Sequence, residues 1–342
     1  MTANHEIDLS KRKFTVRLIV ERALARGWKV KGFETNPAIH LLYIPGRSKP
    51  VQIFSAAPYQ MSYPAAKIAQ DKYITNQILH DAGLPVPDEL LIHTQQPLEL
   101  EPVGQFLRQH TRVVVKPLDA SHGKGVTTGI TTLGHLEQAV EDAKLESAKR
   151  VVLLQEQLSG QDIRIVIIGH EYRDAINRIP ATVIGDGVHT AQELIERENR
   201  REERGDNYMT RLTVIPLDKA RQFLGAEGLQ YVAADGEPVP VIGVSNIGMG
   251  GERNNISRSI PLFLRDIAVQ AAKVLELPVC GVDFMVRSLP KSTSTPEQLA
   301  AKIIEVNACP MLTMYEDLRS DEQNTLIDAY LNYLAGDNPD KD

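Results

Sequence analysis

The segment Val115-Lys-Pro-Leu-Asp-Ala-Ser-His-Gly-Lys-Gly-Val126 decides the fold prediction, because it joins two apolar runs through a glycine-containing turn. Residues 112–116 are typical of a buried strand and residues 126–130 of a second one. Such a turn lets backbone N–H groups approach a polyphosphate, and Lys116 and Lys124 would add positive charge. The order of residues matches neither a strand-to-helix phosphate loop nor a dinucleotide fingerprint. Taken alone, the segment is better explained by a plain tight hairpin.

Two apolar runs near the carboxyl terminus carry acidic side chains. Asp283 lies in residues 280–286, and Glu305 and Asn307 lie in or directly after residues 302–306. Residues two apart on a strand point to the same face, so Glu305 and Asn307 should share one. Their oxygens and that of Asp283 are hard ligands that suit Mg²⁺. Either strand alone fits an amphipathic hairpin with polar residues at the surface, but both together, after a phosphate turn, favour a metal site.

A third segment, Gln155-Glu-Gln-Leu-Ser-Gly-Gln-Asp-Ile-Arg164, follows a predicted strand at residues 151–155. A strand that runs into a short linker at Gly160 would place backbone groups against adenine. Asp162 would then reach a ribose hydroxyl, and Arg164 would begin the next strand facing the phosphates. By itself this segment is better explained as a surface loop with a solvated Asp.

The rest of the chain alternates helical and strand patterns, which indicates an α/β or α+β protein. Helices are predicted at residues 15–26, 65–82, 133–144 and 261–277, and further strands at 30–33, 41–44, 163–168 and 172–179. The charged run 193–211 is predicted as a solvated helix followed by a mobile loop. A flexible hairpin loop is expected at 292–295.

Composition excludes several classes of function. The 342 residues are 42% hydrophobic and carry a net charge of −6, so no basic field indicates nucleic acid or an anionic membrane as a partner. The two cysteines sit in apolar stretches without metal spacing and are expected to be reduced core thiols. No signal core and no run of eighteen apolar residues is present. We therefore expect a soluble, cytoplasmic protein.

The order of Lys116, the glycine-rich turn, Gln155-Glu156, Asp283 and Glu305-Val-Asn307 resembles the ATP-grasp superfamily, over roughly residues 69–315. Three segments make the ATP-grasp parts of cyanophycin synthetase and of bifunctional glutathione synthetase the most similar families. They are Val115-Lys-Pro-Leu-Asp119 with its loop, Arg178-Ile-Pro-Ala-Thr-Val-Ile-Gly-Asp-Gly-Val-His-Thr190, and Ser245-Asn-Ile with Gly250-Gly251.

The resemblance implies an α+β (α/β) fold in which two lobes clasp ATP between antiparallel sheets. It places a small N-terminal α/β unit at residues 1–88, a central lobe at 89–159, and a catalytic lobe at 160–335 with a lid insert near 185–206. It also implies a role for each matching residue. The phosphates would be bound by Lys72 and Lys116 under a lid formed by Ser121, His122, Gly123, Lys124 and Gly125. Adenine would be bound by Gln155, Glu156 and Leu158, the ribose by Asp162, and Mg²⁺ by Asp283, Glu305 and Asn307. The catalytic Arg164 and Arg178 would bind the transferred phosphate, and Ser245 and Asn246 would bind the substrate.

The activity implied is that of an ADP-forming ligase that joins the carboxylate of an amino acid or short peptide to an amine through an acyl-phosphate. It would use ATP with one or two Mg²⁺ ions, for which Mn²⁺ can substitute. The resemblance to these families also implies a homodimer or homotetramer. The chain departs from its relatives at Val241-Ile-Gly-Val244, where they usually carry an Arg, and at Gly248-Met-Gly-Gly251. A nucleotide-binding scaffold without turnover and a phosphotransferase that does not ligate are therefore the alternatives.

Overall fold

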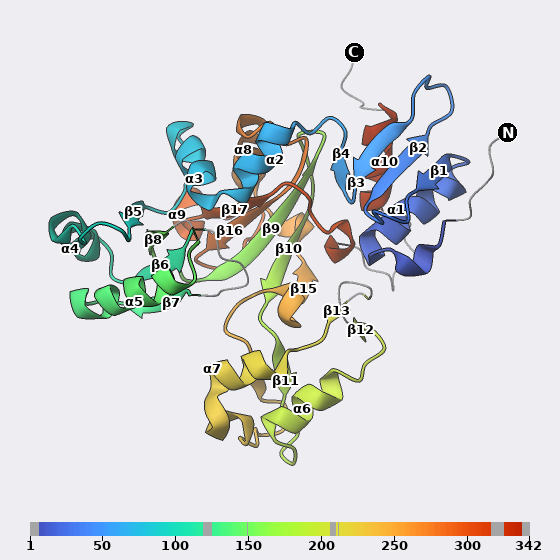
Figure 1. The fold of residues 1–342 in the computed structure, drawn as a ribbon. Coiled ribbons are helices and arrows are strands. Elements are labelled where there is room, and N and C mark those ends of the chain that lie inside the picture. The colour runs from blue at the N-terminus through green and yellow to red at the C-terminus, as the bar shows by residue number, and fades with distance from the viewer. Residues whose placement is uncertain are drawn as a thin grey trace.

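The computed structural model describes residues 7–118, 125–148, 150–205, 210, 212–315 and 325–336 (Figure 1). Its centre is an antiparallel five-stranded sheet in the order β15-β10-β9-β16-β17. The strands are β9 (Gln161–Ile168), β10 (Glu171–Ile179), β15 (Glu252–Asn255), β16 (Val279–Val286) and β17 (Lys302–Asn307). The apolar run in β9 is fully buried because both faces of the sheet are covered there.

One face of this central sheet is covered by three helices: α2 (Tyr63–Gln70), α3 (Lys72–Asp81) and α8 (Leu262–Val274). The sequence predicted one helix over residues 65–82, and this prediction is wrong. The backbone leaves the helical region at Asp71, whose side chain accepts a hydrogen bond from the Ile74 N–H and so begins α3 as its N-cap. The break turns α3 so that Lys72, its first residue, lies beside β17.

The other face is covered, at one end, by the N-terminal unit. This unit is an antiparallel sheet of β1 (Lys29–Gly32), β2 (Ile39–Tyr43), β3 (Val51–Phe54) and β4 (Ala57–Pro58), with η1 (Leu9–Lys11), α1 (Phe14–Ala25) and α10 (Thr325–Ala335). The helix predicted at 15–26 is confirmed, and Gly27 follows it with φ 76°. β3 and α10 were not predicted. Asp328 of α10 pairs with Arg22 at 2.9 Å and with Arg26 at 2.7 Å, which ties the two helices together.

The central lobe is a second antiparallel sheet, in the order β5-β8-β6-β7. It consists of β5 (Glu89–His93), β6 (Val113–Pro117), β7 (Thr127–Ile130) and β8 (Val151–Glu156), packed with α4 (Leu100–Gln109) and α5 (Leu133–Leu145) in one core. The predicted strands 112–116, 126–130 and 151–155 and the helix 133–144 are confirmed. In the central lobe, α4 and β5 were not predicted.

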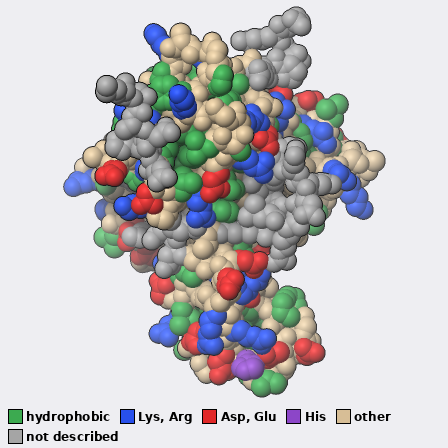
Figure 2. Space-filling model, turned by 90° about the vertical axis from the view of Figure 1, so that its right-hand side faces the viewer, with side chains coloured by type: hydrophobic (Ala, Val, Ile, Leu, Met, Phe, Trp, Pro, Cys, Tyr) green, Lys and Arg blue, Asp and Glu red, His purple; other side chains and the backbone are tan. Residues whose placement is uncertain are grey.

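Residues 181–250 form a projecting subdomain with its own hydrophobic core (Figure 1). It contains β11 (Thr182–Ile184), α6 (Ala191–Glu198), β12 (Arg204–Gly205), β13 (Leu212–Thr213), α7 (Leu217–Leu229), β14 (Pro238–Pro240) and η2 (Ile247–Met249). Figure 2 shows side chains of both charge signs interspersed over it. The helix expected at the start of the charged run is confirmed as α6, which opens with a capping box of Thr190 and Glu193. The subdomain is larger than the expected insert at 185–206.

The remaining elements are η3 (Ser257–Ser259), α9 (Pro296–Leu299) and η4 (Leu312–Tyr315). Cys280 is buried and confirms a core thiol, but Cys309 is exposed, so that half of the prediction is wrong. Within the described ranges, no helix is both long and apolar enough to cross a bilayer. All sheets are antiparallel except the short β12–β13 pair, which gives an α+β fold.

Candidate active site

An ion-pair cluster of Asp162, Arg164, Arg178 and Asp283 lies on the face of the central sheet opposite α2, α3 and α8. Asp283 on β16 and Arg164 on β9 are directly opposite each other. Arg164 Nε donates to Asp283 Oδ1 at 2.5 Å and its Nη2 to Oδ2 at 2.6 Å, while Arg178 Nη2 lies 2.9 Å from Oδ2. The side chain of Asp283 is fully buried. Burial alone would raise the pKa of Asp283, but the Arg164 and Arg178 guanidinium groups outweigh it and hold this pKa below its ordinary value.

Arg178 is shared between both carboxylates of the cluster. It lies opposite Asp162 in the β9–β10 register, and its Nε and Nη2 each donate to a different oxygen of Asp162 at 2.9 Å. Burial raises the pKa of Asp162 to about 6, against the pull of Arg178 and with a contribution from Asp283. Two arginines and two aspartates make the cluster neutral. Arg164 and Arg178 therefore lie together, as the sequence predicts. Asp162, which was predicted to reach a ribose hydroxyl, contacts Arg178 in this structure.

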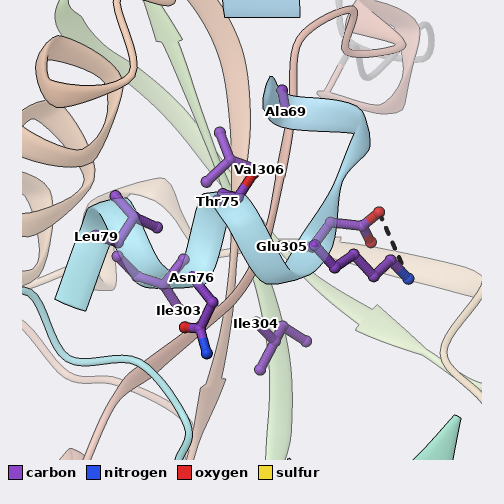
Figure 3. Close-up of a pocket in the computed structure, with 9 residues that line it drawn as sticks. Ala69, Thr75, Asn76, Leu79, Ile303, Ile304, Glu305 and Val306 are labelled. Carbon is purple, nitrogen blue, oxygen red and sulfur yellow. Dashed lines mark ion pairs between the residues drawn. The ribbon is translucent and has the colours of Figure 1, made fainter. Parts of the chain in front are cut away.

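The three predicted metal ligands share one face. Glu305 is opposite Asp283 in the β16–β17 register, and Asn307 Nδ2 lies 3.4 Å from Asp283 Oδ2. A register shift follows Asp283, which leaves Ile304 unpaired and keeps Glu305 on the side of Asp283. Lys72 Nζ is 3.9 Å from Glu305 Oε1 (Figure 3). The oxygen donors of two strands and a predicted phosphate-binding lysine thus meet at one place.

Lys116 and Glu89 form the wall of the site on the central lobe. Lys116 Nζ donates to Gln155 Oε1 at 2.8 Å, and Gln155 Nε2 donates to Glu89. Burial, and then the charge of Lys72, lowers the pKa of Lys116 to about 8, while Glu89 and Glu305 oppose this shift. Burial likewise raises the pKa of Glu89. The sequence missed Glu89, since it stands at the start of a strand without any motif.

Glu156, predicted at the adenine site, joins the two lobes. It pairs with Lys302 of β17, and its carboxylate accepts a hydrogen bond from the Asp88 N–H at 3.2 Å. His110 Nδ1 lies 3.6 Å from Glu156 Oε2. Asp88, His110 and Glu156 bring their ligand atoms within 4.8 Å of one another, a grouping that the sequence did not reveal. Because Lys302 of the catalytic lobe already neutralises Glu156, we interpret Glu156 as an interlobe contact and not as a metal ligand.

Two glycines near the site are required by close packing. Gly160 has φ 141°, and a side chain there would collide with the backbone carbonyl of Val286. Gly125 has φ 66°, and an added Cβ would lie 2.7 Å from the ring of Pro117. Leu158 of the predicted adenine linker is half-buried. The other residues of the predicted phosphate lid, Ser121, His122, Gly123 and Lys124, lie outside the described residues.

The predicted substrate residues Ser245 and Asn246 lie where the projecting subdomain meets the end of β10. Asn246 Oδ1 accepts from the Gly248 N–H at 2.8 Å, which begins η2. Gly251 packs against the carbonyls of Asn246 and Ile179, so a larger residue would push the turn away from β10. Arg253 on β15 is opposite Arg178 and donates to the carbonyl of Thr313 at 3.2 Å. Sequence reasoning missed this third arginine.

A crevice between α3 and β17 adjoins these groups and is shown in Figure 3. Its volume is about 10 Å³, enough for a single water molecule. Lys72 and Glu305 stand at its polar end, and Leu79 and Ile303 line the apolar part. The crevice therefore borders the candidate site without being large enough to hold a nucleotide.

Residues 88–196 match the family model of the prokaryotic glutathione synthetase ATP-grasp domain. The chain is 33% identical over 256 residues to cyanophycin synthetase of Crocosphaera subtropica, covering 73% of this chain and 28% of that protein. It is 30% identical over 260 residues to the glutathione biosynthesis bifunctional protein of Pasteurella multocida, covering 74% and 34%. It thus spans about a third of the length of these curated relatives.

The fold is also that of a solved structure. The crystal structure of a bifunctional glutathione synthetase from Pasteurella multocida superposes with a TM-score of 0.72 at 23% identity, covering 96% of this chain and 45% of that one. The match includes the N-terminal unit, the two lobes and the projecting subdomain, since almost the whole chain is covered.

Proposed function

The chain belongs to the ATP-grasp superfamily, with a domain of the prokaryotic glutathione synthetase type, and on this premise we propose that it is an ADP-forming carboxylate–amine ligase. Its substrates would be amino acids or short peptides. The observation that carries the proposal is that three sets of groups converge around Asp283 and Glu305 on the paired strands β16 and β17. These are the Arg164–Arg178 pair, the oxygen donors Asp283, Glu305 and Asn307, and the two lysines Lys72 and Lys116.

The donor set fits Mg²⁺ in its chemistry, because an Asp, a Glu and an Asn carbonyl are hard oxygen ligands that share a face. Asp283 must exchange an arginine contact for the ion, and Asn307 must turn its amide oxygen towards it. Bound there, one or two Mg²⁺ ions, or Mn²⁺ in their place, would neutralise charge on the β- and γ-phosphates of ATP.

The protein's own groups then position the reactants. Lys72 and Lys116 bind phosphate oxygens, Gln155, Glu156 and Leu158 border adenine, and Asp162 reaches the ribose. A substrate carboxylate attacks the γ-phosphorus, which breaks the bond to ADP and forms an acyl-phosphate. An amine then attacks the acyl carbon and releases phosphate. Arg164 and Arg178 hold the transferred group by their planar forks once they release part of their contact with the aspartates.

Water must be kept from the acyl-phosphate, because hydrolysis would waste ATP. The projecting subdomain is joined to the end of β10 just after Arg178, so its movement would open or cover the acceptor side of the site. Ser245 and Asn246, at the same junction, are proposed to contact the substrate. Excluding water is then the task of this subdomain.

The test is a screen for ADP release over pairs of amino acids and short peptides with ATP and Mg²⁺. ADP that appears only when both an acid and an amine are present supports the ligase, whereas a stable phosphorylated product indicates a phosphotransferase. ATP binding without turnover in the whole screen indicates a scaffold, which the closed ion-pair cluster around Asp283 would favour. We also propose that the protein acts on small molecules in the cytoplasm and that it forms a homodimer or homotetramer. Light scattering measures the number of subunits.

A further inference from the structure

A groove lies at the far end of the β9–β10 hairpin from the ion-pair cluster. Its volume is about 360 Å³, within the range of small-ligand sites. Four parts of the chain line it: the segment before α2 (Gln60, Ser62), the hairpin turn (His170), the end of α8 (Lys273, Glu276), and α10 (Tyr333). His170 is six residues from Arg164, which corresponds to about 20 Å along a strand. The groove is therefore separate from the candidate active site.

Two residues of this groove occupy backbone positions that suit glycine better. His170, with φ 62°, follows Gly169, with φ 67°, in the two-residue turn between β9 and β10. Such turns need positive φ at both positions, and glycine or asparagine meets this need at least cost. Glu276, with φ 53°, follows α8 where the Leu277 N–H closes back onto the Ala272 carbonyl at 2.9 Å, again a position that favours glycine.

Only five non-glycine residues in the described ranges have positive φ, and two of them line this one groove. Backbone strain of this kind persists only where the surrounding structure holds it, and it clusters at functional sites. The strain at His170 and Glu276 thus points to a use for both side chains.

The chemistry of the groove combines one cation, one anion and several neutral hydrogen-bonding groups. Lys273 and Glu276 supply the two charges. Burial, and then Tyr59, raises the pKa of Tyr333 to about 12, so its hydroxyl can donate. Burial and the nearby Lys273 lower the pKa of His170, whose buried Nδ1 has no hydrogen-bond partner among the described residues.

We propose that this groove binds a small zwitterion, a free α-amino acid or a dipeptide, as a ligand distinct from the reacting substrates. Lys273 binds its carboxylate and Glu276 its ammonium group, while His170 and Tyr333 hydrogen-bond between them. The ligand contacts the N-terminal unit, α8 and the turn of the hairpin whose other end carries Arg164 and Arg178. Its occupancy is therefore placed to affect the strands that hold the reaction site.

The test is calorimetric titration of the whole protein, without nucleotide, with glycine, L-alanine, L-glutamate and glycylglycine. Acetate and methylammonium, which each carry one of the two charges, are the ligand controls. We expect at least one zwitterion to bind tenfold or more tightly than either control. Lys273→Met and Glu276→Gly should each weaken that binding at least tenfold.

Glu276→Gly is a sharp variant because it removes the carboxylate while relieving the backbone, so the protein should unfold at the same or a higher temperature. Ala300→Gly is the matched control, since Ala300 follows α9 with φ 42° and does not line the groove. It should leave binding unchanged. The proposal is overturned if no zwitterion exceeds the controls, or if binding survives both groove variants. Loss of binding in Arg178→Lys but not in the groove variants would assign the ligand to the reaction site and also overturn it.

Discussion

Asp283 holds Arg164 by two parallel hydrogen bonds across the β9–β16 ladder, and its carboxylate is fully buried. Removing one partner of a buried ion pair leaves the other charge desolvated, which costs about 3–5 kcal/mol. Arg178 depends on the same carboxylate. Structure and chemistry are therefore coupled at Asp283, and experiments on the site must separate the two.

Glu305→Gln should lower the rate of ADP release by orders of magnitude while the melting temperature stays within a few degrees. The side chain is 36% exposed and pairs only loosely with Lys72, so the fold does not depend on its charge. The predicted metal site, in contrast, does depend on this charge. Asp283→Asn should also stop turnover but unfold more easily, since Arg164 loses its carboxylate partner and Arg178 keeps only Asp162. Near-normal turnover of Glu305→Gln at limiting Mg²⁺ would refute its role as a ligand.

Arg178→Lys should reduce turnover on the order of a hundredfold, equivalent to a few kcal/mol of barrier, with a much smaller change in ATP affinity. Lysine keeps the charge but cannot contact two oxygens of a phosphoryl group at once. Steady-state kinetics and calorimetry with ATP measure the two effects. An equal loss in both would assign Arg178 to ground-state nucleotide binding.

ATP affinity should fall as the pH rises through about 8, because the pKa of Lys116 in the free protein is lowered to about 8. Bound phosphate favours the charged amine, so protein that has lost this proton must regain it to bind. Between pH 7 and pH 9.5 the dissociation constant for ATP should increase in the wild type and stay constant in Lys116→Met. A wild-type curve parallel to that of Lys116→Met would contradict the prediction.

The same lowered pKa has a consequence for stability. Charged Lys116 is disfavoured in the folded state, whereas in the unfolded chain it keeps its ordinary pKa of 10.5. Between about pH 8 and 10.5 the unfolded state binds more protons, so this residue makes the free energy of unfolding rise with pH in that window. Below about pH 8 Lys116 is charged in both states, so its full cost to the free energy of unfolding is present. Urea unfolding should therefore show Lys116→Met to be more stable than the wild type at pH 7, by an amount that shrinks towards pH 10.

The nucleotide product should be ADP, and hydroxylamine should trap the activated acid as a hydroxamate when no amine is present. Both follow from attack of the carboxylate on the γ-phosphorus before the amine enters. Ion-exchange chromatography separates ADP from AMP, and the ferric assay detects the hydroxamate. Stoichiometric AMP, or no hydroxamate from an acid that supports ligation, would exclude this order of events.

Local pattern was sufficient to predict most of the central sheet. The runs that became β9, β16 and β17 are mostly apolar, and the placement of Glu305 and Asn307 on one face follows from the strand period alone. The break at Asp71 was missed because the helical spacing of apolar residues continues through it, and only the cap on Ile74 reveals the second helix.

The partners within the site could not be predicted in the same way. The contact of Arg178 with Asp162 depends on the β9–β10 register, and that of Asp283 with Arg164 joins residues 119 apart in the chain. Glu89 reaches Gln155 and the lysines through the pairing of β5 with β8. No local pattern specifies such pairings, so sequence alone indicated the residue types of the site but not which charges neutralise each other.

The packing of α10 against α1 has a consequence for how the protein is made. Ile19 and Ala23 of α1 share a core with Ile327, Tyr330 and Leu331 of α10, about three hundred residues later. A ribosome that has delivered α1 must therefore continue as far as α10 before the first helix finds its partner. The central lobe, whose contacts are closer in sequence, can fold while α10 is still being made, whereas α1 remains exposed to chaperones until α10 emerges.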